Sequence, residues 1–482
     1  MSPVHARGTA RLRPAFAAGL AVALLGAAAS FAGSAQAAGA RAAAAPPAAV
    51  PASDRDFDLP RILTPREQAA VRDAWLAKRL DTVVPMLMKR EGIDLWLLVA
   101  REYMEDPVLR TMLPATWMSA RRRTVLMFFD PGDGRPVERL AIARYPVGDA
   151  FPAAWNPDEQ PDQWARIAQL VAERDPRKIA INRSKVFALA DGMTDTETDA
   201  LLAALGERFG PRIVSGERLA LGWLETRIPE EMAVYPTISR IANAIIAEGF
   251  SEKVITPGVT TTADVQWWYR QRIAQLGLVP WFHPTVALQR AGGETKSATA
   301  MFAARRTEEV IQPGDLLHVD LGIVYLGLAT DTQNMAYVLR PGETDAPAGL
   351  KAGLADANRL QDLLMKNYTA GESGCSLQQR TRKEALALGL KPNIYSHAVG
   401  YHGHGAGPWV GMWDDQDACP PPGEYEVQPN TVWAIELNAE RAVPEWGGKN
   451  VRFMLEEIAF FDGRKVEFLD GRLTRFHLVP RP

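Results

Sequence analysis

The sequence contains few of the features that mark several common protein classes. Lys and Arg total 54 against 57 Asp and Glu, a formal net charge of −3, and no dense basic run lies within the body of the chain. Nucleic acid is therefore not an expected partner. There are two cysteines, Cys375 and Cys419, which an oxidising compartment would permit to form one disulfide. The sequence alone leaves open whether they lie within bonding distance.

Long apolar runs are confined to the N-terminus. Three Arg precede the run "AFAAGLAVALLGAAASFA", which is followed by "SAQA", with Ala at both small-residue positions of a signal-peptidase site. Residues 1–37 are therefore predicted to be a secretory signal peptide, and a permanent membrane anchor is the alternative. Its removal leaves a mature charge of 51 − 57 = −6. We expect an exported protein that is not inserted in the membrane after signal removal, periplasmic if the cell is Gram-negative.

The remaining chain is long enough for two globular domains. At 482 residues with 47% hydrophobic residues, it can bury large cores. Residues 38–58 form an Ala/Pro linker with nothing to bury. Residues 59–222 begin with Thr64 as an expected N-cap and Pro65 at the first helical position. Strand and helix patterns then alternate, which predicts an α/β domain.

The second half has a different organisation. Two long helical patterns precede a strand-rich region near residues 280–340, and two more, at about 347–368 and 376–388, lead into strands that run almost to the C-terminus. Charged and His residues within apolar strands are concentrated here. The chemistry is therefore expected in this half.

Two aspartates interrupt an apolar, Gly-punctuated stretch, "HVDLGIVYLGLATDTQ", residues 318–333. Asp320 and Asp331 lie 331 − 320 = 11 positions apart. If the flanking segments pair as strands, both carboxylates can face one interior pocket, where they would repel each other without a cation. The simpler alternative is that one Asp caps the hairpin turn.

Imidazole and carboxylate groups interrupt apolar segments downstream. "YSHAVGYHGHGAGPWVG" contains three of the seven histidines, and "VWAIELNAE" and "VRFMLEEIAFF" place glutamates in apolar strands. Gly403, Gly405 and Gly407 are expected to let the backbone approach whatever the imidazoles bind. Each acid alone could form an ion pair with Arg or Lys. Together with the two aspartates, these groups favour a shared metal site.

The order of these segments resembles the pita-bread metallopeptidases, a family that includes aminopeptidase P, prolidase, methionine aminopeptidase and the non-peptidase creatinase. "DLGIVYLGLATD", "GHGAG", "IEL" and "LEE" match its motifs in order. The resemblance covers residues 226–482 and implies an α+β pita-bread catalytic domain. Residues 59–222 are similar to the α/β N-terminal domain of the creatinase and aminopeptidase P branch.

The resemblance implies a site for two divalent metal ions. The implied ligands are Asp320, Asp331, His404, Glu436 and Glu456, with His402 and Glu457 as alternates. Asp331 and Glu456 would bridge the two ions. One imidazole and four carboxylates suit Mn²⁺, Co²⁺ or Zn²⁺. Such a pair lowers the pKa of a bridging water and polarises the scissile carbonyl.

The chain departs from the family pattern at two expected histidines. Peptidases of the family usually carry a His about 17 residues before the first Asp, a place that here falls near Ala303. They also carry a His seven residues after the metal-binding His, where this chain, after a two-residue insertion, has Trp413. We expect Trp413, together with His397 and His402, to contact substrate and to contribute to catalysis.

The resemblance implies a hydrolase that cleaves an N-terminal or dipeptide amide bond, of the Xaa-Pro type, in a small peptide or amide substrate. Two alternatives stay open: hydrolysis of a non-peptide C–N bond, as in creatinase, and a protein that binds metal or a ligand without catalysis. Family members are often homodimers, so the resemblance allows a homodimer here.

Overall fold

The computed structural model describes residues 59–293, 308–404 and 407–481. The predicted signal peptide, the predicted linker and the position near Ala303 lie outside these residues. Within them, every helix is too short or too polar to span a bilayer.

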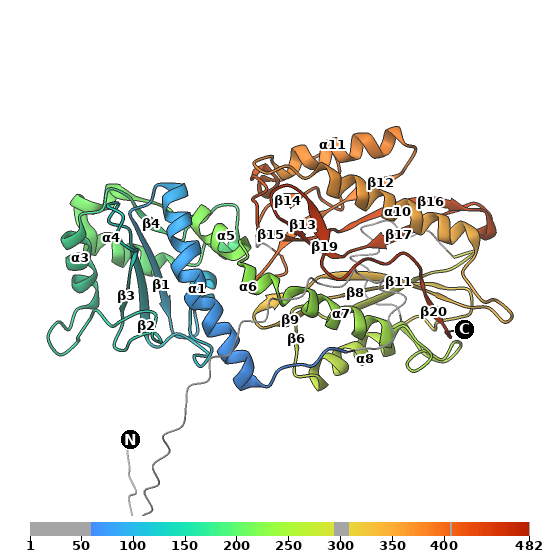
Figure 1. The fold of residues 1–482 in the computed structure, drawn as a ribbon, viewed down its shortest axis with the longest axis horizontal. Coiled ribbons are helices and arrows are strands. Elements are labelled where there is room, and N and C mark those ends of the chain that lie inside the picture. The colour runs from blue at the N-terminus through green and yellow to red at the C-terminus, as the bar shows by residue number, and fades with distance from the viewer. Residues whose placement is uncertain (1–58, 294–307, 405–406, 482) are drawn as a thin grey trace, which may run out of the picture. The chain divides into compact units, whose positions relative to one another are not determined.

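The N-terminal domain is built on one mixed sheet (Figure 1). The strand order is β3-β2-β1-β4-β5; β1 pairs in parallel with β4 and antiparallel with β2. The strands are β1 (Leu95–Arg101), β2 (Arg123–Phe129), β3 (Glu138–Ile142), β4 (Ile179–Ile181) and β5 (Ile213–Ser215). Alternate residues along each strand therefore face opposite sides of the sheet.

Helices cover both faces of this sheet (Figure 1). The helices are α1 (Pro65–Glu91), α2 (Pro107–Thr111), α3 (Gln163–Arg174), α4 (Asp195–Phe209) and α5 (Glu217–Glu225). Trp96 and Leu98 pack with α1, whereas Leu95 and Leu97 pack with α3 and α4. Helix α1 begins as predicted, because Thr64 caps it in a reciprocal box with Glu67. The predicted α/β domain is confirmed.

The C-terminal domain places helices outside sheets that are antiparallel except for the parallel pair β11 and β20 (Figure 1). The helices are α6 (Pro229–Met232), α7 (Tyr235–Gly249), α8 (Thr262–Gln275), α10 (Ala348–Asn367) and α11 (Gly374–Ala387). The strands are β6 (Val279–Pro280), β7 (Thr285–Gln289), β8 (Leu316–Leu321), β9 (Ile323–Tyr325), β10 (Leu328–Ala329), β11 (Thr332–Val338), β12 (Pro392–Ile394), β13 (Ser396–Val399), β14 (Trp409–Val410), β15 (Thr431–Ala434), β16 (Leu437–Val443), β17 (Lys449–Leu455), β18 (Ile458–Phe461), β19 (Val466–Phe468) and β20 (His477–Val479).

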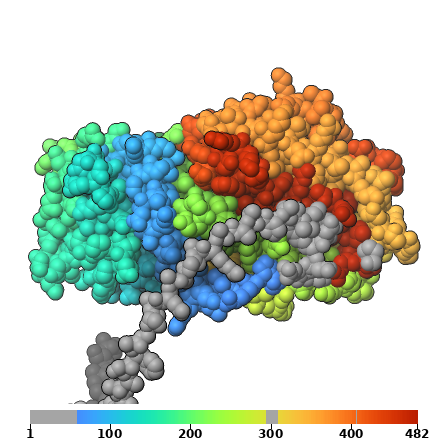
Figure 2. All heavy atoms as spheres, in the orientation of Figure 1, coloured from blue at the N-terminus to red at the C-terminus, as the bar shows by residue number. Residues whose placement is uncertain are grey.

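The last strands of the chain pack on the helices of this domain. Helix α10 contacts β16, β17 and β19, and Figure 2 shows the red C-terminal residues lying against the orange helical region. Phe453 of β17 lies so close to α10 that a Cβ at Gly353 would be 2.0 Å from its ring. These contacts fix β16 and β17, whose ends carry two of the predicted ligands.

Candidate metal centre

The antiparallel hairpin of β8 and β11 positions both predicted aspartates. Asp320 on β8 lies opposite Gln333 on β11, as the sequence predicted for paired strands, and Asp331 directly precedes β11. Leu317, Val319 and Leu321 of β8 belong to the core formed with α7 and α8. Because side chains alternate along a strand, Asp320 lies on the other face of β8. The hairpin thus brings the two carboxylates together.

Each predicted glutamate lies in a two-residue gap between consecutive strands. Glu436 lies between β15 and β16, and Glu456 between β17 and β18. The backbone of Glu456 bonds to that of Gln333 in both directions, with N···O distances of 3.0 and 3.2 Å, which joins this break to the aspartate hairpin. The alternate ligand Glu457 accepts hydrogen bonds from Leu473 N (2.8 Å) and Asn334 Nδ2 (3.5 Å). Glu456, not Glu457, faces the aspartates.

Of the three predicted histidines, His397 lies deepest among the acids. Its Nε2 is 3.5 Å from Asp331 Oδ2, 3.5 Å from Glu456 Oε1 and 3.8 Å from Glu436 Oε2. His404 Nε2 lies 3.6 Å from Asp331 Oδ2, but its side chain is 65% exposed against 7% for His397. The sequence prediction had put His404 in the central place. The alternate, His402, is in none of the metal-compatible groups found among the described residues.

These side chains form three overlapping groups whose ligand atoms lie within 4.8 Å of one another. The groups are Asp320, Asp331 and Glu456; Asp331, His397 and His404; and His397, Glu436 and Glu456. Asp320 Oδ1, both Glu456 oxygens and His397 Nε2 are buried without a hydrogen-bond partner among the described residues. Buried polar atoms are normally satisfied, so these orphaned atoms and their hard-donor chemistry fit divalent cations.

The pKa shifts of the cluster indicate that keeping its carboxylates charged without a cation is unfavourable. Burial, and then the neighbouring carboxylates, raise the pKa values of Asp320, Glu436 and Glu456 well above their ordinary values. Burial disfavours the charged form of His397, but the carboxylates of Asp331 and Glu436 and the carbonyl of Ala398 together raise its pKa. The ring of His404 is partly desolvated where it packs against Trp281 and His397, and this desolvation, with a smaller effect of the His397 charge, lowers the pKa of His404 to about 4. Its imidazole is therefore neutral at physiological pH.

A hydrogen-bonded relay that the sequence analysis missed holds Glu436. Gln333 donates from Nε2 to Glu436 Oε1, and its own Oε1 lies 2.9 Å from His318 Nε2. Burial lowers the pKa of His318 to about 4, so the ring is neutral. The polar residues His318 and Gln333 within apolar β8 and β11 were the available signal. Partners of this kind orient metal ligands.

An apolar cavity of about 480 Å³ opens from the acidic cluster. Its aromatic and thioether walls come from Trp281, Phe282, Tyr395, Trp409, Met412 and Trp413. Trp413 therefore lies at the site, as expected, although its contact with a substrate remains a prediction.

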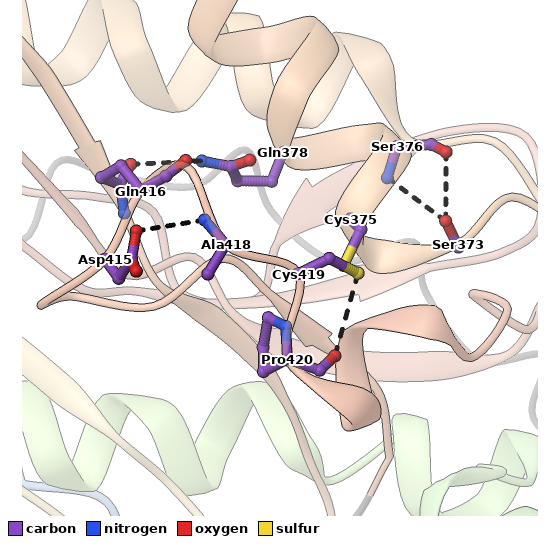
Figure 3. The surroundings of a disulfide bond; sticks show 9 residues. All are labelled: Ser373, Cys375, Ser376, Gln378, Asp415, Gln416, Ala418, Cys419 and Pro420. Carbon is purple, nitrogen blue, oxygen red and sulfur yellow. Dashed lines mark hydrogen bonds between the residues drawn. A yellow bond between two sulfur atoms is a disulfide. The ribbon is translucent and has the colours of Figure 1, made fainter.

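A disulfide fixes the segment that follows Trp413. Cys375 of α11 and Cys419 are bonded, with a Cα–Cα distance of 5.6 Å, which answers the question that the sequence left open (Figure 3). Gln378 of the same helix donates to Gln416 O at 3.0 Å (Figure 3). Gln416 in turn donates to Ile394 O at 2.7 Å. One wall of the cavity is thereby tied to α11 and β12.

The glycines near the cluster serve packing against Trp281. A Cβ at Gly403 would lie 2.2 Å from Trp281 Cζ2, and one at Gly322 would lie 2.1 Å from its Nε1. Gly407 instead lies against Glu225, and Gly405 is outside the described residues. The expectation that these glycines let the backbone approach whatever the imidazoles bind stays a prediction. Gly403 and Gly407 give room to an aromatic wall and a buried acid.

A buried arginine from the N-terminal domain supports the loop that carries the histidines. The guanidinium of Arg79 contacts the rings of Trp223 and Tyr401, at 4.4 and 4.9 Å from their centroids. Glu231 accepts from Arg79 Nη1 at 3.1 Å and from the Tyr401 hydroxyl at 3.2 Å. Tyr401 directly precedes His402, so α1 helps to fix the loop that leads to His404.

Comparison with protein families identifies the class. Residues 237–455 match the model of metallopeptidase family M24, and this span contains all of the clustered ligand candidates except Glu456, which directly follows it. The match, together with the observed fold, shows that the C-terminal domain belongs to the M24, or pita-bread, family. No curated protein matched the chain.

Solved structures share the whole two-domain arrangement. An X-Pro aminopeptidase from Thermotoga maritima aligns with a TM-score of 0.58 and 16% identity, covering 81% of this chain and 99% of that one. A Xaa-Pro dipeptidase from Bacillus anthracis gives a TM-score of 0.55 and 16% identity, covering 83% and 99%. A dipeptidase from Mycobacterium ulcerans also gives a TM-score of 0.55 and 16% identity, covering 85% and 99%. At these identities the likeness establishes the fold, an α/β domain followed by a pita-bread domain.

Proposed function

We propose that this protein is an exported dinuclear-metal hydrolase that cleaves an N-terminal or dipeptide amide bond, of the Xaa-Pro type. The observation that carries the proposal is the cluster of Asp320, Asp331, His397, Glu436 and Glu456, buried together with orphaned oxygen and nitrogen atoms. When bound, two divalent ions would polarise the scissile carbonyl and lower the pKa of the attacking water.

We assign the imidazole ligand to His397 and a substrate-facing role to His404. His397 is buried and reaches three carboxylates, whereas His404 lies at the exposed side of Asp331. Counting from His397, His404 lies 404 − 397 = 7 residues on. That is the spacing of the second histidine in the family pattern. Its neutral ring can exchange a proton or a hydrogen bond with the substrate, and no insertion before Trp413 is needed.

The aromatic cavity would hold the side chains of the substrate. Trp281, Trp409 and Trp413 offer apolar walls to a proline ring or another side chain beside the reacting amide. Closing those walls around the substrate would exclude bulk water from the acidic cluster.

The disulfide supports export. Structural disulfides persist in oxidising compartments, and both cysteines of the chain are used in this one. The predicted signal peptide at residues 1–37 is the second ground for this part of the proposal.

The test is hydrolysis by the mature protein loaded with Mn²⁺, Co²⁺ or Zn²⁺. A panel of dipeptides and short peptides, with and without proline in the second position, is incubated with enzyme, and release of the first residue is measured. Creatine and related guanidino compounds form the comparison set. We expect metal-dependent release of the first residue. Hydrolysis restricted to the guanidino set would favour the non-peptide alternative, and metal binding with no turnover on any amide would favour a binding protein.

A further inference from the structure

The N-terminal domain has a cavity of its own, with a volume of about 1550 Å³ against about 480 Å³ at the acidic cluster. Arg101 and Arg123, which pair across β1 and β2, line it together with residues 116–119 and 121–122 and the start of α3. None of its lining residues lines the acidic cavity, so the two are distinct sites.

The lining of this arginine cavity is strongly cationic in an acidic chain. Five arginines line it against two acids, Glu102 and Asp162, an excess of 5 − 2 = 3 positive charges. The arginines are Arg101, Arg121, Arg122, Arg123 and Arg144. Buried Glu197 pairs with Arg101 and Arg123, at 3.4 and 2.6 Å. The other three form no ion pair with any residue in the described ranges, which leaves their guanidinium groups available to a ligand.

Tryptophans hold three of the guanidinium groups in place. Arg121 lies over Trp117 with its Cζ 5.0 Å from the ring centroid, Arg123 over Trp164 at 4.7 Å, and Arg144 over Trp155 at 5.6 Å. Stacking on a ring face leaves the N–H edge of a guanidinium open, and that edge matches the two oxygens of a carboxylate. In Arg123 this edge is occupied by Glu197, so Arg121 and Arg144 are the stacked groups that can receive a ligand. The cavity thus combines pre-oriented carboxylate receptors with apolar walls.

Apolar side chains project at the rim. Tyr103 is 82% exposed and Met118 is 87% exposed, and both line the cavity. Exposed aromatic and thioether groups beside arginines are typical of surfaces that bind other molecules.

We propose that the arginine cavity binds acidic peptide segments that carry aromatic or aliphatic side chains among their carboxylates. Its volume exceeds the roughly 300–1,000 Å³ of sites for single small molecules, which favours a chain segment. Glu102 and Asp162 would repel a phosphate at every nucleotide of a nucleic acid, whereas a peptide of mixed side chains can place apolar groups beside them. This proposal does not depend on the acidic cluster or on metal.

The test is fluorescence anisotropy with the mature protein and a short labelled peptide that alternates Glu with Trp and Leu. Its N-terminus is acetylated, so the proposed hydrolase cannot shorten it. We expect saturable binding that weakens with salt. The double variant Arg121→Glu/Arg144→Glu should raise Kd at least about tenfold, since it removes two charge-assisted contacts. The matched control, Arg66→Glu/Arg464→Glu, makes the same charge change at exposed positions outside the cavity and should leave Kd unchanged.

Four results would overturn the proposal. The first is no saturable binding of the acidic peptide, and the second is an equal loss in both double variants, which would indicate a nonspecific charge effect. The third is tighter binding of a single-stranded oligonucleotide of equal charge than of the peptide, with the oligonucleotide binding lost in the cavity double variant but kept in the control double variant. Sedimentation of the same proteins tests whether a second copy of this chain occupies the cavity. A wild-type dimer that dissociates in the cavity double variant, while peptide binding stays unchanged, would also contradict the proposal.

Discussion

The two cavities of this chain handle concentrated charge in opposite ways. In the C-terminal domain, oxygens of Asp320, Asp331 and Glu456 lie within 4.8 Å of one another, and Asp320 Oδ1 and both Glu456 oxygens are buried without a hydrogen-bond partner among the described residues. In the N-terminal domain, the arginines lie at a more exposed surface, where Glu197 and tryptophan rings share the work of holding them. The buried carboxylates are unfavourable in their charged form without a cation, whereas the more exposed arginines are solvated and can stay charged without a ligand.

This difference teaches how to interpret a charged cluster. Like charges at a solvated surface can persist without a ligand because water screens them. Like charges in a buried pocket either take up protons or bind a counter-ion. The raised pKa values of Asp320, Glu436 and Glu456 correspond to proton uptake when no cation is bound. A bound cation would instead satisfy the buried polar atoms that lack hydrogen-bond partners among the described residues.

The largest expected effect comes from breaking the acidic cluster. Asp331→Asn removes a carboxylate that lies in two of the three groups, and we expect hydrolysis to fall by more than about 100-fold, beyond the usual loss for a residue that only orients a ligand. Initial rates on the best peptide measure it. Asp356→Asn, on α10 and paired with Arg441, is the control and should keep its activity. The arginine-cavity double variant should keep it too, and a comparable loss there would contradict the independence of the two cavities.

A smaller effect is expected from the relay behind Glu436. Gln333→Leu removes the donor to Glu436 and leaves His318 without its partner. We expect metal affinity or activity to fall about 10- to 100-fold, as for other partners that orient metal ligands. Added metal should restore part of the activity, which a general folding defect would not allow. Unchanged affinity and kcat would show that Glu436 is oriented without Gln333.

A buried acid outside the cluster sharpens the comparison. Burial raises the pKa of Glu225 to about 8 from an ordinary 4.5, and its Oε2 has no hydrogen-bond partner among the described residues. The folded protein keeps a proton that the unfolded chain releases. The stability from this group is therefore fully present below pH 4.5 and is lost as pH rises toward about 8.

Glu225→Gln cannot ionise and should remove that decline. From pH 5 to pH 8, we expect the free energy of unfolding of the variant to rise relative to wild type by on the order of 2 kcal/mol, which appears as an increasing Tm difference in favour of the variant. Thermal melts across this range measure it, and the metal-site acids contribute equally to both proteins. Parallel Tm curves would mean that Glu225 is not neutral in the folded state.

The smallest effect is expected at the aromatic wall. Trp413→His should change the relative kcat/KM among peptides more than it changes stability, because the side chain lines the cavity and a disulfide elsewhere holds its loop. A peptide panel and a melt of both proteins test this. An unchanged order of substrates would contradict its placement beside the substrate.

Much of the fold followed from local patterns, whereas the centre of the site did not. The Thr64 cap, the alternation of strands and helices, and the spacing of Asp320 and Asp331 are encoded within short stretches. Which imidazole approaches the acids depends on the pairing of β13 with β15, a long-range contact that puts His397 beside Ala434. Gly-flanked His404 was the more conspicuous residue in sequence. The relay through His318 and Gln333 was missed because two polar residues in apolar strands do not by themselves show that they bond to each other and to Glu436.

The arginine cavity shows a second limit. Arg121, Arg122 and Arg123 are consecutive at the start of β2, whereas Arg101 ends β1 and Arg144 lies two residues after β3. The sequence therefore shows one short basic run but not the full set. Only the sheet order β3-β2-β1 brings them to one place.

Metal stoichiometry tests the central claim most directly. The mature protein is dialysed against Mn²⁺, freed of excess ion and analysed for bound metal beside Asp331→Ala and the arginine-cavity double variant. The account predicts two ions per chain in the wild type and in the cavity variant, and fewer in Asp331→Ala although it remains folded. One ion or none in the wild type, or full occupancy in folded Asp331→Ala, would contradict it.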